Sequence, residues 1–274
     1  MKLILITNNP KVASYATECG VGRIMVDTET LGKKARQFNV NAVFNSHSIN
    51  DVMDIKDTCD AEIICRINPI NSHTGLEIER VIDAGADYLM VPMIKDEIDI
   101  KTILSFTNDN IKFIPLLETS SSIIRLKEIV SIDGVSELYF GLNDLSIDMK
   151  LTFLHEVTSS RLMRFCSDII CEKVPFGFGG VAKLGKGHIP ADLILSEHFL
   201  AKSSRVILGR AFHSNSITIN DFKNNTNLKN DVNNLLSFWD SLNDENATAL
   251  NVKLCSSITK LRNELAIQNL KKDI

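Results

Sequence analysis

Short apolar runs alternate along the chain with longer stretches in which apolar residues recur every three or four positions. The short runs have the character of buried β-strands, and the longer stretches have the period of amphipathic helices. Strands that alternate with helices predict βα units and a parallel sheet. Nine such runs occur, at residues 2–9, 23–29, 41–46, 62–69, 88–94, 112–119, 137–144, 174–180 and 205–212.

The number of runs favours a (β/α)8 TIM barrel over residues 1–213. Eight strands close such a barrel, so one run is left over, and the run at 41–46 is the weakest. A charged helix is predicted near residues 31–38. The alternative fold is an open doubly wound sheet, which carries a glycine-rich turn after its first strand. Residues 8–14 contain no glycine, which counts against that alternative.

The composition changes after residue 213. Residues 214–234 are rich in Asn, Asp, Ser and Thr and are interpreted as a polar linker, whereas residues 235–270 show helical periodicity. Residues 214–274 are therefore predicted to form a linker and a C-terminal helical extension. Such a tail either covers its own barrel or packs on a neighbouring subunit. The length of the linker favours the second arrangement, and with it a homo-oligomer.

Bulk composition narrows the class of protein. The 274 residues are 44% hydrophobic, which suits one large barrel core, and the net charge of −4 gives no support to a nucleic-acid or membrane partner. No run approaches the length of a membrane span, and the N-terminus lacks the pattern of a secretory signal. The six cysteines form no CxxC pair and resemble buried thiols of a reducing compartment. We expect a cytoplasmic protein.

Two acidic residues end successive predicted strands. Glu118 closes the run at 112–119, and Asp144 closes the run at 137–144. In barrels of this kind chemistry gathers at the carboxyl ends of the strands. Neighbouring strands lie roughly 5 Å apart, so both carboxylates can reach one cation, and oxygen ligands suit Mg²⁺ or Mn²⁺. The alternative is that both are solvated loop acids or helix caps.

Other polar residues sit at neighbouring strand ends. Arg66 follows apolar residues in a buried run, so its guanidinium needs either a substrate carboxylate or an internal partner such as Glu29. Arg210 follows the same logic, and His47 comes after the third run. The glycine-rich segment 175–187, with Lys183, is either a phosphate-binding loop or a set of tight turns. No predicted strand ends on a lysine placed for a Schiff base.

Five motifs occur in a characteristic order: RIMVDTETLGKKARQ, CRINP, AGADYLMVPMI, PLLETSSSI and YFGLNDLSIDM. Together they resemble the HpcH/HpaI-type aldolase and citrate lyase beta-subunit family of phosphoenolpyruvate/pyruvate-binding barrels, over about residues 1–213. The resemblance implies a metal-dependent lyase or aldolase that cleaves or forms a C–C bond through a pyruvate-type enolate. Its substrates would be a 2-oxo acid and an aldehyde or acyl partner.

The resemblance also implies roles for individual residues. It makes Glu118 and Asp144 the Mg²⁺ or Mn²⁺ ligands and Arg66 the residue that binds the substrate carboxylate. Asp27 and Glu29 match the acids after the second strand, and Asp83 matches a further family aspartate. The positions of other residues suggest further roles, which do not come from the resemblance. Gly141 and Asn143 are expected to orient the enolate oxygen, and Lys183 and Arg210 to bind substrate. Metal-bound water, Glu29 or His47 is expected to move the proton.

One position departs from the aldolase branch of the family. Thr30 stands where that branch has a histidine, so the chain leans towards the citrate lyase branch. A thioester lyase or Claisen-type enzyme is therefore an alternative, and an inactive binding or assembly subunit is another. The segment from Pro175 onward resembles a subgroup associated with bacterial surface-polysaccharide gene clusters, which implies a sugar-like or phosphorylated partner.

Overall fold

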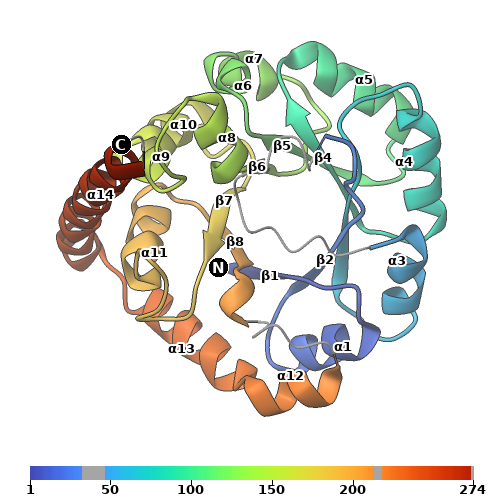
Figure 1. Ribbon diagram of the computed structural model, residues 1–274. Helices are drawn as coiled ribbons and strands as arrows, with labels where there is room; N and C mark the ends of the chain where they lie inside the picture. Colours follow the sequence, from blue (N-terminus) through green and yellow to red (C-terminus); the bar gives the residue numbers. More distant parts are fainter. Residues whose placement is uncertain (33–46, 213–217, 273–274) are drawn as a thin grey trace.

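Eight of the nine apolar runs pair into a closed parallel barrel in the computed structural model, with helices on its outside (Figure 1). The structure describes residues 1–32, 47–212 and 218–272. The predicted (β/α)8 TIM barrel is confirmed. The run predicted at 41–46 and most of the helix predicted at 31–38 lie outside the described residues.

The strands follow one another around the barrel in chain order. They are β1 (Lys2–Ile6), β2 (Arg23–Asp27), β3 (Glu62–Arg66), β4 (Tyr88–Ile94), β5 (Lys112–Leu117), β6 (Leu138–Phe140), β7 (Phe176–Val181) and β8 (Arg205–Leu208).

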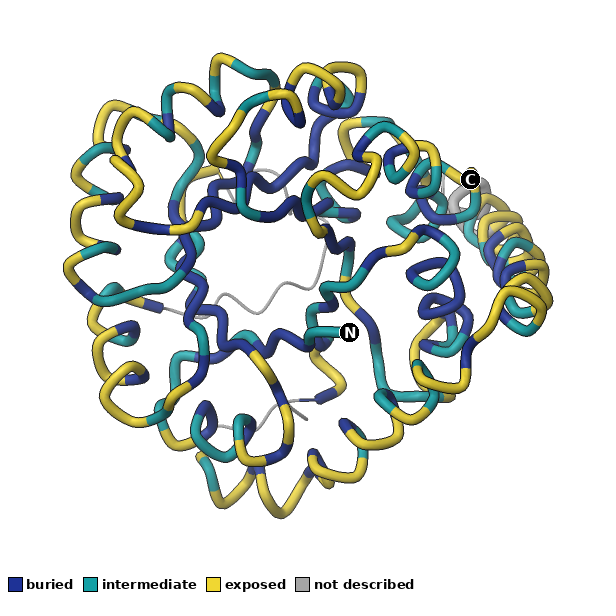
Figure 2. Tube along the Cα trace, turned by 180° about the vertical axis from the view of Figure 1, so that it is seen from behind, coloured by how far each residue is buried: buried dark blue, intermediate teal, exposed yellow. Residues whose placement is uncertain are grey.

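The helices cover the outside of the sheet, and exposed residues face outward from them (Figures 1 and 2). Up to β8 they are α1 (Pro10–Glu18), α3 (Ile49–Lys56), α4 (Thr74–Asp83), α5 (Glu97–Thr107), α6 (Ser120–Ile124), α7 (Leu126–Ile129), α8 (Leu142–Asp148), α9 (Glu156–Ser159), α10 (Leu162–Ile170) and α11 (Ala191–Leu200). After β8 come the 3₁₀ turn η1 (Arg210–Phe212), α12 (Ile219–Asn225), α13 (Leu228–Asp240) and α14 (Asp244–Lys272).

Alternation along each strand divides the barrel interior into layers. The middle layer is apolar and includes Met25, Ile64, Leu116 and Tyr139. Side chains two residues further along point the same way, so Asp27 and Arg66 reach the carboxyl-end layer from β2 and β3. The larger cluster of buried residues packs on the other face of the strands, against the helices.

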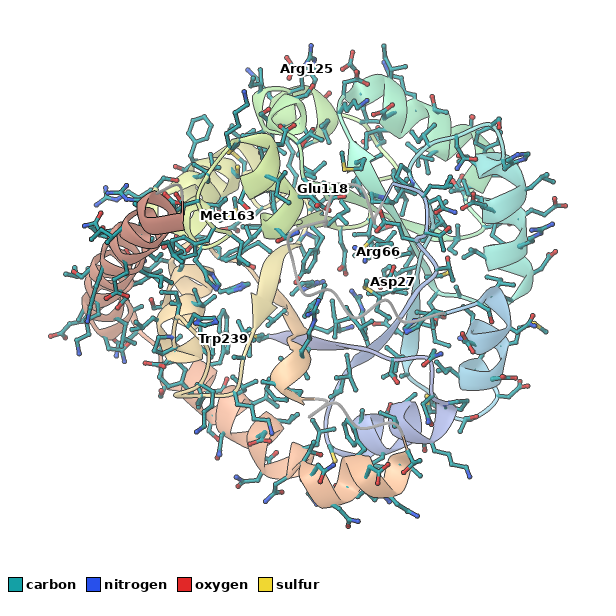
Figure 3. The ribbon with its side chains drawn as sticks, viewed as in Figure 1. Asp27, Arg66, Glu118, Arg125, Met163 and Trp239 are labelled. Atoms are coloured by element: carbon teal, nitrogen blue, oxygen red, sulfur yellow. The ribbon has the colours of Figure 1, made fainter. Side chains whose placement is uncertain are left out.

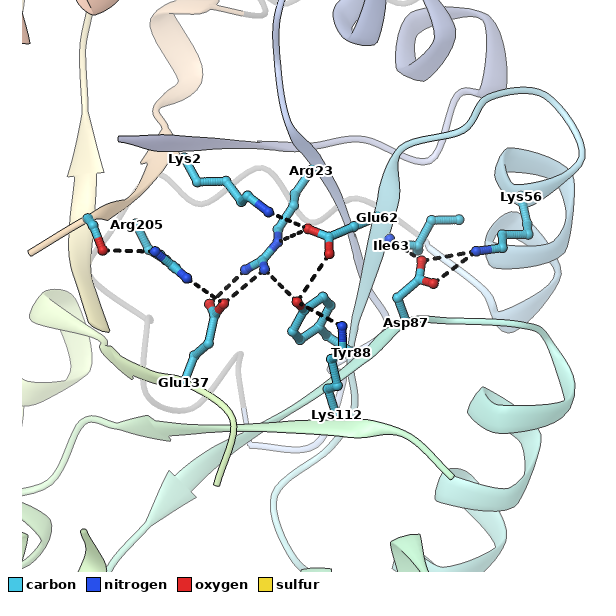
Figure 4. A network of polar contacts seen from close by, with 11 residues as sticks. Lys2, Arg23, Lys56, Glu62, Ile63, Asp87, Tyr88, Lys112, Glu137 and Arg205 are labelled. Atoms are coloured by element: carbon cyan, nitrogen blue, oxygen red, sulfur yellow. Dashed lines mark hydrogen bonds and ion pairs between the residues drawn. The ribbon is translucent and has the colours of Figure 1, made fainter. Parts of the chain in front are cut away.

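A buried polar network fills the opposite, amino-terminal end of the barrel (Figure 4). Arg23 Nη1 and Nη2 donate to the two carboxylate oxygens of Glu137 at 2.7 and 2.8 Å, and Arg23 Nε donates to Glu62 at 2.8 Å. Arg205 Nη2 also donates to Glu137, at 2.9 Å. Lys2 Nζ also donates to Glu62, at 2.6 Å, so three cationic side chains hold the two glutamates at this end of the barrel.

The polar linker predicted at 214–234 is wrong for the residues that the structure describes there, because α12 and α13 cover most of that stretch. Phe222, Leu228 and Val232 are buried in the same core cluster as the barrel helices. The tail also packs on its own barrel, where α14 runs beside α9 and α11 (Figure 1). The part of the predicted linker that the structure describes is therefore mostly helical, and the homo-oligomer stays a prediction.

Candidate active site

Arg66 and Asp27 form the centre of the carboxyl-end layer (Figure 3). They are direct neighbours in the register of β2 and β3, and both point into the barrel. Arg66 Nε and Nη2 donate to the two oxygens of Asp27 at 2.8 and 2.7 Å, and Glu29 lies 3.5 Å from Nε. This side-on contact uses one edge of the guanidinium and holds it rigidly. The end-on edge, between Nη1 and Nη2, is directed away from Asp27.

Glu118 follows β5 and is almost completely buried, with 3% of its surface exposed. Its Oε1 accepts a hydrogen bond from the backbone N–H of Met93 at 3.0 Å. Met93 has a left-handed backbone (φ 60°) at an irregularity in the pairing of β4 with β5, so Glu118 supports a strained residue. Burial and the charge of Asp144 raise the pKa of Glu118 to about 8, against the opposing effect of Arg66.

The sequence predicted that Asp144 ends a strand, and this is wrong. β6 stops at Phe140, and Asp144 lies in the first turn of α8 together with Asn143. The turn still brings Asp144 close enough to Glu118 to raise its pKa. Gly141 makes this possible, because a side chain at that position would collide with the Glu118 carboxylate. The predicted pairing of the two carboxylates is thus present, by a different local route.

The two carboxylates fit a divalent cation. A buried acid whose pKa is raised by burial and by a second acid is destabilised in its charged form, and a cation between them reverses that effect. Oxygen donors suit Mg²⁺ or Mn²⁺. Within the described residues no three His, Cys, Asp or Glu side chains are grouped to hold a metal. Glu118 and Asp144 would be the protein ligands of such an ion, with its remaining positions left to substrate and water.

The proton-transfer candidates lie on the β2 side of the site. Glu29 is buried near Arg66, as predicted. His47 is buried as well, and its Nδ1 accepts a hydrogen bond of 2.9 Å from the backbone N–H of Asp27. Thr30 does not replace the missing histidine, because its backbone N–H and hydroxyl both donate to Asn68. Asp83 is exposed at the end of α4, before β4, so it lies at the opposite end of the barrel.

A cavity of about 710 Å³ opens from this layer. Six of the predicted site residues line it, namely Arg66, Glu118, Gly141, Asn143, Asp144 and Arg210. Backbone atoms of the glycine-rich segment also line it, at Gly179, Gly180 and Gly187.

Lys183 is not brought into the cavity, although the sequence suggested it as a substrate-binding residue. Its Nζ pairs with Asp231 of α13 at 2.8 Å. The glycines of β7 have packing roles, since a side chain on Gly177 would collide with Arg205 and Tyr139, and one on Gly179 would collide with Leu142. These contacts support the interpretation of tight backbone approach for the glycines, and the phosphate-binding role stays a prediction.

Sequence reasoning missed Tyr139 and the apolar wall of the cavity. The Tyr139 hydroxyl donates to the Gly179 carbonyl at 2.6 Å and accepts from the Ile207 N–H at 2.9 Å, so it fixes β7 and β8. Alternation in LYF would have placed Tyr139 inside the barrel. Leu261 and Leu265 of α14 reach the cavity from the far end of the chain, and no local signal predicts that contact.

The chain is similar to known proteins in sequence and in fold. The family model described as HpcH/HpaI aldolase/citrate lyase matches residues 2–160. None of the curated proteins matches the chain in sequence. No helix in the described part of the chain has the length and apolar character needed to cross a membrane.

Solved structures share the fold at low sequence identity. An HpcH/HpaI aldolase from Desulfitobacterium hafniense DCB-2 has a TM-score of 0.57 and 13% identity, covering 76% of this chain and 85% of that one. A family protein from Burkholderia cenocepacia J2315 has a TM-score of 0.58 and 14% identity, covering 76% and 87%. The citrate synthase SbnG has a TM-score of 0.55 and 14% identity, covering 76% and 85%.

Proposed function

Because the chain belongs to the HpcH/HpaI aldolase/citrate lyase family, we propose that it is a divalent-metal-dependent carbon–carbon lyase or aldolase that acts on a pyruvate-type 2-oxo acid. The family is one of lyases and aldolases. The observation that carries the proposal is the buried Glu118 carboxylate, placed beside Asp144 and Arg66 at the end of the barrel where such enzymes bind substrate.

In this proposal Glu118 and Asp144 hold Mg²⁺ or Mn²⁺. The cation supplies Lewis-acid stabilisation of the negative charge that develops on the oxo-acid oxygen when the C–C bond breaks or forms. Arg66 binds the substrate carboxylate through the guanidinium edge that Asp27 leaves open. Asp27 is a positioning residue, since its bidentate contact fixes the plane of that guanidinium.

The remaining step is proton transfer to or from the acceptor oxygen. Glu29 is the proposed acid or base, because it is buried and lies 3.5 Å from Arg66, although its side chain does not itself line the cavity. His47 lies on the same side of the site, where its Nδ1 accepts a hydrogen bond from the backbone N–H of Asp27. The acceptor is an aldehyde in the aldolase reading.

A thioester partner is the second candidate. It is favoured by Thr30, which is bonded to Asn68 where the aldolase branch has a histidine. One of the structurally similar proteins is a citrate synthase. Both candidate functions form an enolate of the 2-oxo acid, and they differ in whether an aldehyde or a thioester reacts with it. Release of free thiol from an acyl-thioester in the presence of a 2-oxo acid therefore distinguishes them.

The first test is calorimetric titration of metal-stripped protein with pyruvate, with and without Mn²⁺. We expect binding that requires Mn²⁺ and is lost in Glu118→Gln. Loss of the methyl proton signal of pyruvate in D₂O then reports enolate formation. A protein that binds no pyruvate with Mn²⁺ present, and exchanges no methyl proton, contradicts the proposal and favours an inactive binding subunit.

A further inference from the structure

Two chemically different sets of residues line the cavity. Arg66, Glu118 and Asp144 lie at the strand ends, and the proposed function assigns them to the 2-oxo acid and its cation. A second set, called here the apolar arm, consists of hydrocarbon side chains that lie outside the strands. They are Phe153, Leu154, Ile189, Ile194, Leu261 and Leu265.

The size of the cavity exceeds what a three-carbon acid needs. Cavities of about 300–1,000 Å³ enclose most of a drug-sized ligand, and this cavity has about 710 Å³. The space beyond Arg66, Glu118 and Asp144 therefore belongs to another part of the substrate. This space belongs to the same cavity as the reacting centre. The molecule that forms the new carbon–carbon bond with the 2-oxo acid must lie there.

The α14 helix that completes the apolar arm is firmly anchored. Asn251 Nδ2 donates to the buried Glu197 at 2.6 Å, and Arg164 pairs with the same carboxylate at 2.8 Å. Leu254 and Ile258 are fully buried against the barrel helices.

Spacing along α14 then directs the last leucines into the cavity. Leu261 and Leu265 follow Ile258 by three and seven residues, so they lie on the same face of the helix. Both line the cavity and are only partly buried. They continue the buried face of α14 to the cavity, where a bound ligand would cover their exposed parts.

The six hydrocarbon side chains of the arm offer no hydrogen bond or charge to a phosphate or sugar-like group, although Arg210 and His188 line the same cavity. Burial lowers the pKa of His155 to about 4, so this cavity residue is neutral at pH 7. Lys183, the lysine of the glycine-rich segment suggested for phosphate, is paired with Asp231 instead. A phosphate or a row of hydroxyls against six hydrocarbon side chains would lose hydrogen bonds to water without replacement.

We propose that the apolar arm binds the hydrocarbon chain of the aldehyde or acyl partner, so that the substrate is a 2-oxo acid extended by an aliphatic group of at least four carbons. This inference rests on the proposed function for the position of the reacting head. It assigns to α14 a role in choosing the partner, with Leu261 and Leu265 as specificity-determining residues.

Straight-chain 2-oxo acids from pyruvate to 2-oxooctanoate test head and chain separately. Each is titrated calorimetrically into the full-length protein, with and without Mn²⁺. Burial of one CH₂ contributes about 0.8 kcal/mol, which is about fourfold in affinity. We expect affinity to rise about two- to fourfold per added carbon over the first four or five carbons, and then to level off.

Two variants locate the gain. Leu261→Asn/Leu265→Asn should flatten the dependence on chain length. Leu265→Trp fills the arm and should shift the best ligand to a shorter chain, which keeps the test informative if the double variant does not fold. Val252→Asn is the matched control, because Val252 lies on α14 and is 63% exposed.

The outcomes separate the two proposals. Mn²⁺-dependent binding of every acid with no gain per carbon overturns the apolar arm and leaves the proposed function standing. Affinities that rise with chain length but are the same with and without Mn²⁺ support the arm and overturn the metal-dependent function. A wild-type gain that persists in both leucine variants overturns the assignment to α14, and absence of binding overturns both proposals.

Discussion

Replacing Glu118 by Gln should stabilise the metal-free protein, although it removes a proposed metal ligand. Gln keeps an oxygen that accepts the hydrogen bond from Met93, and it cannot ionise. Burial and Asp144 raise the pKa of Glu118 from 4.5 to about 8. Because the pKa of Glu118 is higher in the folded than in the unfolded state, its contribution to stability is fully present below pH 4.5. That contribution is lost as the pH rises towards 8.

The magnitude follows from the size of the shift. Each pKa unit corresponds to about 1.4 kcal/mol, so ionisation of Glu118 costs up to about 5 kcal/mol at high pH and about 3 kcal/mol at pH 7. The Gln variant removes this loss. For a chain of this size, 3 kcal/mol corresponds to a rise of roughly 5–10 °C in Tm at pH 7.

The assay is thermal unfolding in chelator from pH 4 to pH 9, repeated with saturating Mn²⁺. The metal-free wild type and Glu118→Gln should coincide below pH 4.5 and diverge above it, and Mn²⁺ should raise the Tm of the wild type alone. Glu128→Gln, at an exposed position on α7, is the control for loss of one acid. If Glu118→Gln is less stable than the wild type at every pH, Glu118 is a structural partner of Arg66 and the reasoning fails.

Three further predictions concern the frame around the site. Arg23→Met leaves Glu137 buried without its main partner and should cost about 3–5 kcal/mol in urea unfolding, whereas Lys202→Met, at a fully exposed ion pair, should leave the urea midpoint unchanged. Burial raises the pKa of Glu62, but hydrogen bonds from Lys2 and Arg23 outweigh it and lower that pKa to about 2. The ionised Glu62 therefore stabilises the fold above pH 4.5, and this stabilisation is lost as the pH falls towards 2. The difference in unfolding free energy between the wild type and Glu62→Gln should shrink over that range, and a constant difference contradicts the ion-pair assignment. Gly177→Ala forces a side chain against Arg205 and Tyr139 and should cost at least about 1–3 kcal/mol, while Gly180→Ala makes only an ordinary contact with Ile207 and should be neutral in the same unfolding assay.

Alternation and strand ends carried much of the fold prediction. The spacing of Arg23, Met25 and Asp27 along β2 places all three inside the barrel, at successive layers. The same spacing applies to Glu62, Ile64 and Arg66 on β3. What the sequence could not supply was the register, which sets Asp27 directly beside Arg66. Arg66 was expected to need an anion, but which of its acidic neighbours would take it depended on that register.

Two of the errors arise from contacts between segments that are distant in the sequence. The Asn-rich stretch after residue 213 has the composition of a linker, yet it forms helices because Phe222, Leu228 and Val232 find buried positions against the barrel. Lys183 pairs with Asp231, which lies in that same stretch. A prediction of Lys183 as a substrate-binding residue depends on the glycine-rich segment alone, and the composition of the stretch after residue 213 gives no sign that Asp231 pairs with it.

The two polar ends of the barrel show how the same kinds of residue serve different purposes. At the amino-terminal end, Arg23 and Arg205 are matched to Glu62 and Glu137, and hydrogen bonds lower the pKa of both acids despite burial. At the carboxyl end, the Arg66 guanidinium is already engaged by Asp27, and the pKa of Glu118 is raised. A buried acid with a raised pKa costs folding free energy that packing around it must offset. Of the two ends of the barrel interior, it is the carboxyl end that carries this cost. The buried Glu197 of α11 also has a raised pKa at a structural position, so the assignment of the active site rests on Glu118 lying beside Arg66 and Asp144 in the cavity.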